Sequence, residues 1–346
     1  MHAHDDRPGP RWLVTGGAGF IGSHLTGALL ARGARVTVLD DLSTGSLGNL
    51  DGLAATHGGA LEVVEGSTLD PGLTGPLVER ADTVVHLAAA VGVKLIVERP
   101  VHTIVNNVEG TRVVLEAAAR HGTPVLLAST SEVYGKGERV PFAEDDDLRL
   151  GPTTRSRWAY ACSKALDEWL GLAYHREQGL PITVLRLFNV VGPRQTGRYG
   201  MVLPTFAGQA LRGEPITVYG SGAQTRCFAH VSDVVEALLR LADCPEAVGR
   251  VVNVGSDEEV SIAELAERVR RLAHSRSPIV RVPFEEAYAS GFEDMARRVP
   301  DVTRLRQLTG FRPATPLDAT IRDVLDHVAA RTAAAGGAAD RRPDAP

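Results

Sequence analysis

The stretch Trp12-Leu-Val-Thr15-Gly-Gly-Ala-Gly-Phe-Ile-Gly22-Ser-His24 decides the fold. Its first four residues form an apolar run typical of a buried strand, and Gly17, Gly19 and Gly22 follow with the spacing GxGxxG. Glycines at such a turn let the backbone approach a pyrophosphate, and the N-terminus of the next helix offers free N–H groups to the anion. The glycine pattern alone is a weak signal, but its place between strand and helix predicts a dinucleotide site.

Five more apolar or β-branched runs follow, separated by stretches of helix length. We expect strands at residues 35–40, 61–65, 83–87, 125–129 and 182–187. Most of these runs are continuously apolar, which is typical of parallel strands covered on both faces. Helical patterns at 21–32 and 110–121 lie between them. This alternation predicts an α/β fold with a doubly wound parallel sheet, the Rossmann arrangement.

The pattern changes after about Asn189, because Pro and Gly become frequent and the strands shorten. We expect residues 11–188 to form the dinucleotide-binding domain and residues 189–331 to form a smaller α/β substrate lobe. Such a lobe would lie over the carboxyl ends of the strands, where ligands of these folds bind. The boundary leaves open that a segment after 189 returns to the first domain. The two ends, 1–10 and 332–346, are predicted to be disordered.

Composition excludes several classes of protein. The 346 residues carry 37 Lys and Arg against 42 Asp and Glu, a net charge of −5, so there is no basic footprint for nucleic acid or anionic lipid. Three widely spaced cysteines form no CxxC pair, which argues against a disulfide framework or a zinc site. No apolar run approaches the ~20 residues of a membrane span, and the N-terminus lacks a signal-peptide pattern. We expect a soluble, cytoplasmic protein without a nucleic-acid, membrane or metal partner.

The second predicted strand ends in Asp40, 18 residues after Gly22. A carboxylate at this point accepts hydrogen bonds from the adenosine ribose and repels a 2′-phosphate, so the sequence favours NAD over NADP. The alternative is that Asp40 and Asp41 only begin a polar turn. Further along, Ser67 and Thr68 are expected to border the adenine. The residues predicted to bind the cofactor are Gly16, Gly19, Phe20, Ile21, Gly22, Asp40, Asp41, Ser43, Thr44, Gly45, Ser67, Thr68, Leu87, Ala88, Ala89, Asn107, Ser129, Tyr160 and Lys164.

Hydroxyl groups and a carboxylate follow the strand at 125–129, in Ser129-Thr-Ser-Glu132. Tyr160 and Lys164 have the i, i+4 spacing that places both on one helix face. A free Tyr has a pKa of about 10, so a base near neutral pH needs a shift of about 3 units, or about 4 kcal/mol. The Lys164 ammonium and the positive nicotinamide both act in that direction. Tyr160 is therefore predicted to take a proton from a sugar hydroxyl while hydride leaves the same carbon, with Thr130 or Ser131 sharing the proton. A YxxxK pair by itself is common on helix surfaces.

These motifs together resemble the extended short-chain dehydrogenase/reductase family that acts on nucleotide sugars. The resemblance runs from about Arg11 to Val328 and rests on TGGAGFIGSH, DDLSTG, STSEVYG, YACSK, RLFNVVGPR and VYGSGAQTRCF. It implies a tightly held, recycled NAD⁺ that oxidises a UDP-sugar at C4. It also implies substrate binding by the C-terminal lobe and a homodimer that packs through helices, including the one that carries Tyr160.

Three local features resemble one branch of this family, the UDP-glucuronate decarboxylases and UDP-apiose/xylose synthases. Glu132 follows Ser131, Arg157 lies three residues before Tyr160, and Arg298 lies in Gly291-Phe-Glu-Asp-Met-Ala-Arg-Arg-Val-Pro-Asp301. In that branch such a Glu serves as acid or base, and such an Arg before x-Pro enters the active site. The alternative for Arg157 is a solvated arginine at a helix start.

The resemblance divides the site between two roles. The predicted catalytic residues are Thr130, Ser131, Glu132, Tyr160, Lys164 and Arg298. The predicted substrate-binding residues are Arg157, Asn189, Arg194, Arg226, Phe292 and Arg298. Oxidation at C4 of a glucuronate makes the C6 carboxylate part of a β-keto acid, so CO₂ can leave into an enolate that hydroxyl groups stabilise. The product would be UDP-xylose, or a UDP-4-keto-pentose if release precedes reduction.

Other outcomes of the same oxidation stay open. Arg194 or Arg198 could hold the carboxylate and protect it, which would give a 4-epimerase of a UDP-hexose or UDP-hexuronate. A 4,6-dehydratase comes third, because Ser131 replaces the Asp found before Glu in thymidine-diphosphoglucose dehydratases. A non-catalytic sensor of NAD or nucleotide sugar is disfavoured, because the Tyr, the Lys and the hydroxyl group are all present.

Overall fold

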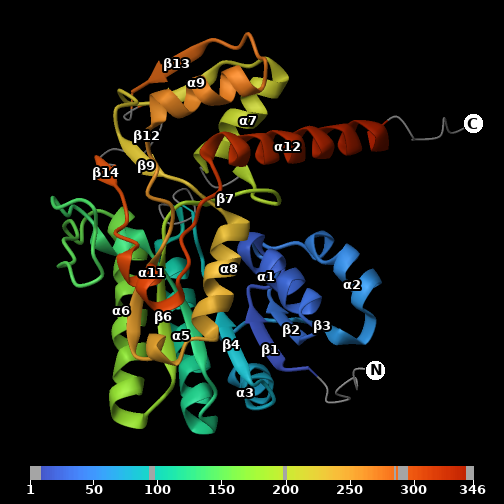
Figure 1. Ribbon diagram of the computed structural model, residues 1–346, viewed down its shortest axis with the longest axis vertical. Helices are drawn as coiled ribbons and strands as arrows, with labels where there is room; N and C mark the ends of the chain where they lie inside the picture. Colours follow the sequence, from blue (N-terminus) through green and yellow to red (C-terminus); the bar gives the residue numbers. More distant parts are fainter. Residues whose placement is uncertain (1–8, 93–97, 198–200, 284–285, 287–294, 340–346) are drawn as a thin grey trace, which may run out of the picture.

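A seven-stranded parallel sheet forms the centre of the molecule (Figure 1). The computed structural model describes residues 9–92, 98–197, 201–283, 286 and 295–339. The strand order is β11-β6-β5-β4-β1-β2-β3, with every pair of neighbours parallel. The strands are β1 (Arg11–Thr15), β2 (Arg35–Asp40), β3 (Leu61–Glu65), β4 (Thr83–His86), β5 (Val125–Thr130), β6 (Ile182–Leu187) and β11 (Arg250–Val254). The predicted doubly wound parallel sheet is confirmed.

Helices cover both faces of this sheet. Each face has its own apolar core: Leu25, Leu29 and Leu238 pack on one side, and Leu115 and Ile182 belong to the core on the other. The first face carries α1 (Phe20–Ala31), α8 (Val231–Ala242) and α11 (Thr303–Thr309); the second carries α3 (Pro71–Glu79), α5 (Pro100–His121) and α6 (Arg157–Gln178). A short helix, α2 (Asp51–His57), precedes β3. The continuous apolar strands predicted from the sequence are therefore buried from both sides.

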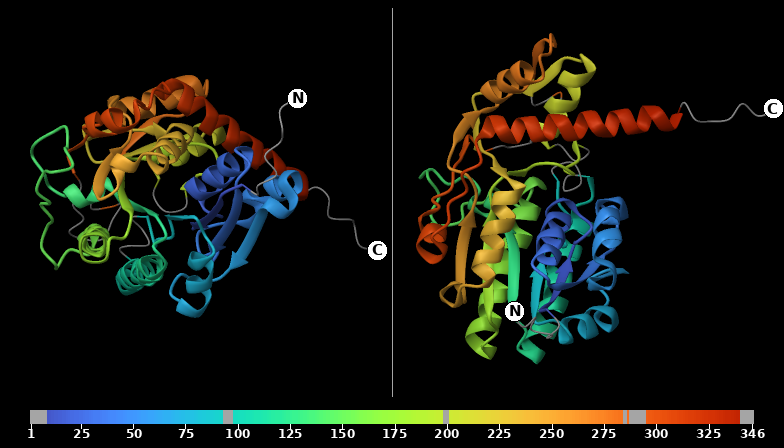
Figure 2. Two further views of the ribbon diagram at one scale, coloured as in Figure 1. Left: turned by 60° about the horizontal axis from the view of Figure 1, so that its bottom comes forward. Right: turned by 45° about the vertical axis from the view of Figure 1, so that its right-hand side comes forward.

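The smaller lobe has its own core around Phe206, Ile216, Leu265 and Ile321. Its helices and strands are α7 (Val202–Arg212), β8 (Ile216–Tyr219), β9 (Thr225–Cys227), β12 (Glu259–Ser261), α9 (Ile262–Leu272), β13 (Ile279–Val282), β14 (Arg297–Arg298) and α12 (Leu317–Ala339). Two short strands, β7 (Val190–Val191) and β10 (Ala229–His230), pair in parallel beside the sheet. Figure 2 shows the lobe above the carboxyl ends of the large sheet.

Two segments of the expected lobe belong to the sheet domain instead. Residues 231–254 form α8 and the edge strand β11, and residues 303–309 form α11, which packs on the same core through Leu305. The apolar residues Val252 and Val254 of β11 are fully buried, and a strand of this kind is most stable when it extends an existing parallel sheet. Residues 189–331 are thus a lobe interrupted by two returns to the sheet.

The end of helix α12 overlaps the predicted disordered tail. Helix α12 continues to Ala339 and so includes residues 332–339, Thr-Ala-Ala-Ala-Gly-Gly-Ala-Ala. Alanine has the highest helix propensity, and the first proline after this stretch is Pro343, so the helix continues beyond its packed part. Residues 1–8 and 340–346, which were also predicted to be disordered, lie outside the described residues. Within the described part of the chain, no helix is long and apolar enough to cross a membrane.

Candidate active site

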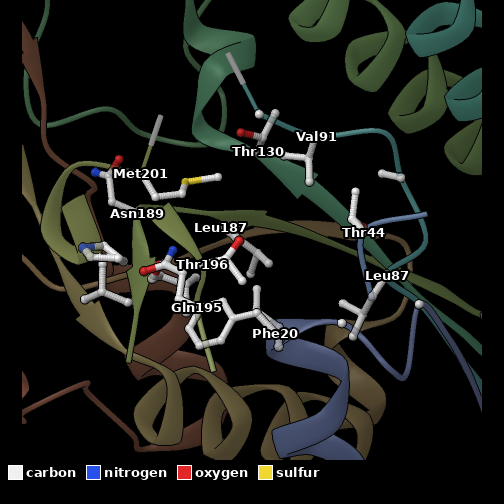
Figure 3. Close-up of a pocket in the computed structure, with 18 of the residues that line it drawn as sticks. Phe20, Thr44, Leu87, Val91, Thr130, Leu187, Asn189, Gln195, Thr196 and Met201 are labelled. Atoms are coloured by element: carbon white, nitrogen blue, oxygen red, sulfur yellow. The ribbon is translucent and has the colours of Figure 1, made fainter. Parts of the chain in front are cut away.

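A cavity of about 1030 Å³ lies between the sheet domain and the lobe. Its walls come from the glycine turn after β1, the ends of β2, β4, β5 and β6, the start of α7, and residues of α12. Figure 3 shows Phe20 and Gln195 at one end of this pocket and Thr130 and Val91 at the other. The carboxyl edge of the sheet thus forms the floor of the cavity, as expected for a ligand site of this fold.

The glycine turn has the close contacts that a dinucleotide site requires. A Cβ atom on Gly22 would lie 2.2 Å from the Gly16 carbonyl oxygen, so only glycine permits this approach of helix to turn. Gly16 has φ +71°, in the left-handed region that favours glycine. Helix α1 begins at Phe20, directly after the turn, and its N-terminus faces the cavity with Gly19 and Phe20 in the wall. The turn therefore fits the diphosphate of NAD.

Asp40 is buried at the end of β2 and lines the same cavity. Its two carboxylate oxygens accept hydrogen bonds from the backbone N–H groups of Ala18 and Leu42, at 2.9 Å each. Burial raises the pKa of Asp40, while these N–H donors lower it. Asp40 is thus more than a surface turn residue: the glycine turn itself holds its carboxylate in place.

Most of the predicted cofactor residues lie in the cavity wall. Those that line it are Gly16, Gly19, Phe20, Ile21, Gly22, Asp40, Asp41, Ser43, Thr44, Ser67, Thr68, Leu87, Ala88, Ala89, Ser129, Tyr160 and Lys164. Two do not. Gly45 lies behind Asp40, where a Cβ would come within 2.8 Å of Asp40 Oδ1. Asn107 is buried, and its Oδ1 accepts from the Ala90 N–H at 2.7 Å. Both residues support the wall and do not form part of it.

Tyr160 is buried on α6, and its pKa reflects more charges than the sequence suggested. Burial raises the pKa of Tyr160, the Glu132 carboxylate raises it further, and a hydrogen bond with Thr130 lowers it. Lys164 donates to Asp167 Oδ2 at 2.8 Å, and both side chains are buried. Asp167 also raises the pKa of Tyr160. The expected lowering of this pKa by Lys164 stays a prediction, because the Lys164 ammonium is paired with Asp167, and the side chains that lower the pKa of Tyr160 in this structure are Thr130 and Arg298.

Glu132 lies where arginines from distant segments meet. Arg298 Nη1 donates to Glu132 Oε1 at 2.5 Å, and Arg157 Nη2 lies 3.2 Å from Glu132 Oε2. Burial would raise the pKa of Glu132, but the charges of Arg157, Arg298 and Arg226 outweigh it and hold the pKa below its usual value. Arg298 also donates to Asn189 Oδ1. The charges of three guanidinium groups thus act on one carboxylate inside the cavity.

Three further residues, Arg194, Phe292 and Arg198, were considered as contacts of the substrate. Arg194 lines the cavity, and its charge acts on His24 and His327. Its expected role in holding a sugar carboxylate stays a prediction. Phe292 and Arg198 lie outside the described residues.

Comparison with known proteins agrees with this geometry. The model of the NAD dependent epimerase/dehydratase family matches residues 12–255. The chain belongs to this family. It is 44% identical over 316 residues to a UDP-N-acetyl-α-D-glucosaminuronate decarboxylase of Bacillus cytotoxicus, covering 91% of this chain and 96% of the relative. It is 36% identical to UDP-glucuronic acid decarboxylase 1 of Danio rerio, covering 92% and 72%. The solved structure of an epimerase from Methanothermobacter thermautotrophicus superposes with a TM-score of 0.85 at 30% identity, covering 94% of each chain.

The predicted family, its NAD dependence and the enzymatic character of the protein are thereby confirmed. Members of such a family share a fold and a cofactor, while the substrate depends on a few side chains of the lobe. Within the described part of the chain, no group of three or more His, Cys, Asp or Glu side chains could hold a metal ion.

Sequence reasoning missed several residues that complete this family member's site. One of them is Glu168, which accepts a hydrogen bond from the Ser129 hydroxyl and forms a buried ion pair with Arg186 at 2.7 Å. From the sequence, Ser129 was assigned only to the cofactor. Asp167 was also missed, although its position three residues after Lys164 was a usable signal. His327 and Arg331 line the cavity from α12, and no local pattern marks them.

Proposed function

We propose that the protein is a UDP-hexuronate decarboxylase that oxidises C4 of its substrate and releases C6 as CO₂, with UDP-glucuronate as the main candidate substrate. The observation that carries this proposal is the meeting of Arg157 and Arg298 at Glu132, in the cavity that also contains Tyr160. A planar guanidinium binds a carboxylate with two parallel hydrogen bonds, so this cluster suits an acidic sugar.

The protein's own groups account for the proton movements. NAD, when bound, supplies the hydride acceptor for C4. Tyr160 takes the proton of the C4 hydroxyl, and Thr130 and Ser131 donate hydrogen bonds to the oxygen that becomes the ketone. The C5–C6 bond then breaks, its electron pair enters an enolate, and CO₂ leaves. Because Arg157 and Arg298 keep Glu132 ionised, its first role is to hold these arginines, and it can return a proton to C5 only after accepting one.

The relatives named above differ in the substituent at C2 of the sugar. Both of their substrates are UDP-hexuronates with the same C4, C5 and C6, so the same chemistry applies to each. UDP-glucuronate and its N-acetylated C2 analogue should therefore both be tested. The expected product from UDP-glucuronate is UDP-xylose or UDP-4-keto-pentose.

The decisive experiment is incubation of the purified protein with each UDP-hexuronate in D₂O, followed by mass spectrometry. Decarboxylation predicts loss of the mass of one CO₂ and gain of one deuterium at C5. The product UDP-galacturonate, with no loss of mass, would instead establish a 4-epimerase. A Tyr160→Phe variant is the control, because it keeps the cavity but lacks the proposed base.

We also propose that the protein is a homodimer that associates through α5 and α6. These helices lie side by side on the outside of the molecule (Figure 1). Large apolar side chains are exposed on them: Val101 (74%), Ile104 (43%), Val105 (47%), Leu166 (45%) and Trp169 (60%). A patch of this kind on two neighbouring helices is typical of a protein interface. The cytoplasmic location stays a prediction.

A further inference from the structure

Helix α12 extends beyond the lobe to which it belongs. Its first turns are anchored by Leu317, Ile321, Val324 and Leu325, which are buried in the lobe core with α7 and α9. The rest of the helix crosses above α1 of the sheet domain (Figures 1 and 2). At this crossing, His327 and Arg331 form part of the cavity wall. Their i, i+4 spacing places both on one face of the helix.

Below this crossing, the cavity has a group of basic side chains from three other segments. His24 comes from the second turn of α1, and its Nε2 lies 2.9 Å from the Pro193 carbonyl oxygen. Arg194 is the next residue along the chain and lines the cavity. Burial and the charges of Arg194, His230 and His327 lower the pKa of His24. The basic groups are thus close enough to repel one another.

Within the described residues, this group lacks the acidic partners that usually balance such charges. No hydrogen bond or ion pair is found for the Arg194 or Arg331 guanidinium, and His327 Nε2 is buried without a hydrogen-bond partner. The nearby acidic side chain of α12, Asp323, lies 3.3 Å from His230. A buried nitrogen without a partner, as in His327, and a partly buried cation such as Arg194 are costly unless a ligand completes them, whereas Arg331 is exposed at the rim of the cavity.

We propose that His327 and Arg331 of α12, with Arg194, form a binding site for a diphosphate that enters the cavity between α1 and α12. The site faces the start of α1, whose free N–H groups bind the same kind of anion from the other side. Guanidinium groups and imidazole N–H groups are the usual side-chain partners of phosphate oxygens. Two ligands of this enzyme carry a diphosphate, NAD and the UDP-sugar, and the second rests on the proposed function.

This arrangement gives α12 a role in ligand binding in addition to its packing in the lobe core. The helix is fixed in the lobe, while the glycine turn belongs to the sheet domain, so a diphosphate held between them joins the two parts. Bound ligand would then limit the separation of lobe and sheet. The anionic ligand also relieves the repulsion among His24, His327 and Arg194.

The test compares Arg331→Ala and His327→Ala with a matched control, Arg322→Ala. Arg322 is an exposed arginine on the same helix and is not part of the cavity wall. Protein stripped of nucleotide is titrated calorimetrically with NAD⁺, ADP-ribose, UDP and uridine. Thermal unfolding of each variant verifies that it is folded. These binding measurements do not require turnover, so they stay informative if the protein does not decarboxylate any UDP-hexuronate.

We expect both α12 variants to weaken binding of at least one diphosphate by about fivefold or more, because each removes a charge-assisted hydrogen bond. Loss confined to NAD⁺ and ADP-ribose assigns the site to the cofactor, and loss confined to UDP assigns it to the substrate. Uridine, which has no phosphate, should bind to all variants equally. Unchanged affinity for every diphosphate, or an equal loss in Arg322→Ala or for uridine, would overturn the proposal.

Discussion

Tyr160 shows how a reactive side chain depends on neighbours from several segments. Its phenol is buried and forms a hydrogen bond with Thr130 at the end of β5. The carboxylates of Glu132 and Asp167 are close enough to raise its pKa. Both carboxylates oppose deprotonation, and Lys164 is already paired with Asp167. Thr130 and Arg298 act in the opposite direction, but the net effect raises the pKa of Tyr160, so a cationic ligand in the cavity would help to favour the phenolate.

We predict that Tyr160→Phe removes most turnover and leaves NAD binding intact. Phenylalanine keeps the buried ring but lacks the proton-accepting oxygen, and loss of a general base reduces kcat by roughly 10²- to 10⁴-fold. The measurement is kcat with UDP-glucuronate, together with the amount of NAD that copurifies. Turnover near that of the wild type would show that another group is the base.

Asp40 offers a second prediction at the scale of single residues. Asp40→Asn retains the shape and one acceptor oxygen for the backbone N–H groups of Ala18 and Leu42, but it removes the charge that repels a 2′-phosphate. The ratio of the dissociation constants for NADP⁺ and NAD⁺ should fall by about tenfold. An unchanged ratio would contradict the placement of this carboxylate at the adenosine ribose.

At the scale of secondary structure, β4 is tied to its neighbours through His86. The His86 Nδ1 lies 2.7 Å from Thr15 Oγ1 of β1, and its Nε2 lies 3.1 Å from Thr111 Oγ1 of α5. Burial lowers the pKa of His86 to about 3. This histidine is a packed strand residue, and it connects the layers of the sheet domain.

This burial makes the stability of the fold depend on pH. An unfolded chain has a His pKa of about 6.5, so between about pH 6.5 and pH 3 the unfolded state binds one more proton at this position. The free energy of unfolding should therefore fall as the pH decreases through this window, by up to about 1.4 kcal/mol per pH unit.

Replacement of His86 tests this prediction directly. In His86→Gln, the slope of unfolding free energy against pH in urea titrations should become smaller between pH 6.5 and pH 5. His121, at the exposed end of α5, provides the control His121→Gln, for which the slope should not change. Equal slopes in all three proteins would contradict the assignment.

The observed helix boundaries show which parts of the helices local sequence patterns could predict. Helix α1 begins one residue before the predicted start, because the glycine turn ends there. Helix α5 begins at Pro100, ten residues before the predicted helical stretch. Proline is favoured in the first turn of a helix, where its missing N–H has no intrahelical partner. The polar residues Asn106 and Asn107 concealed this half of the helix from a pattern based on apolar periodicity.

At the scale of the whole molecule, the exposed apolar face of α5 and α6 predicts self-association. Trp169→Glu places a charge within the proposed dimer interface and should convert the protein to a monomer in sedimentation analysis. Leu211→Glu is the matched control, because Leu211 is an apolar residue, 41% exposed, on α7 of the lobe. A wild-type monomer, or a Trp169→Glu dimer, would refute this interface.

The sequence by itself determined six strands of the sheet, the glycine turn and the helical spacing of Tyr160 and Lys164. These features depend on hydrophobic periodicity, glycine conformation and helical spacing, all of which act between residues close together in the chain. The resemblance to a family added Arg298, but its contact with Glu132, 166 residues away, exists only because the lobe folds back over the sheet.

Only the tertiary structure decided the electrostatics of the cavity. The pairing of Lys164 with Asp167, the position of Arg194 beside His24, and the approach of His327 and Arg331 from α12 could not be read from local patterns. Electrostatic energies depend on the separation and burial of charges in space, and residues far apart in the sequence contribute as strongly as neighbours. The chain sequence therefore fixes which groups are available, while folding decides which of them act on one another.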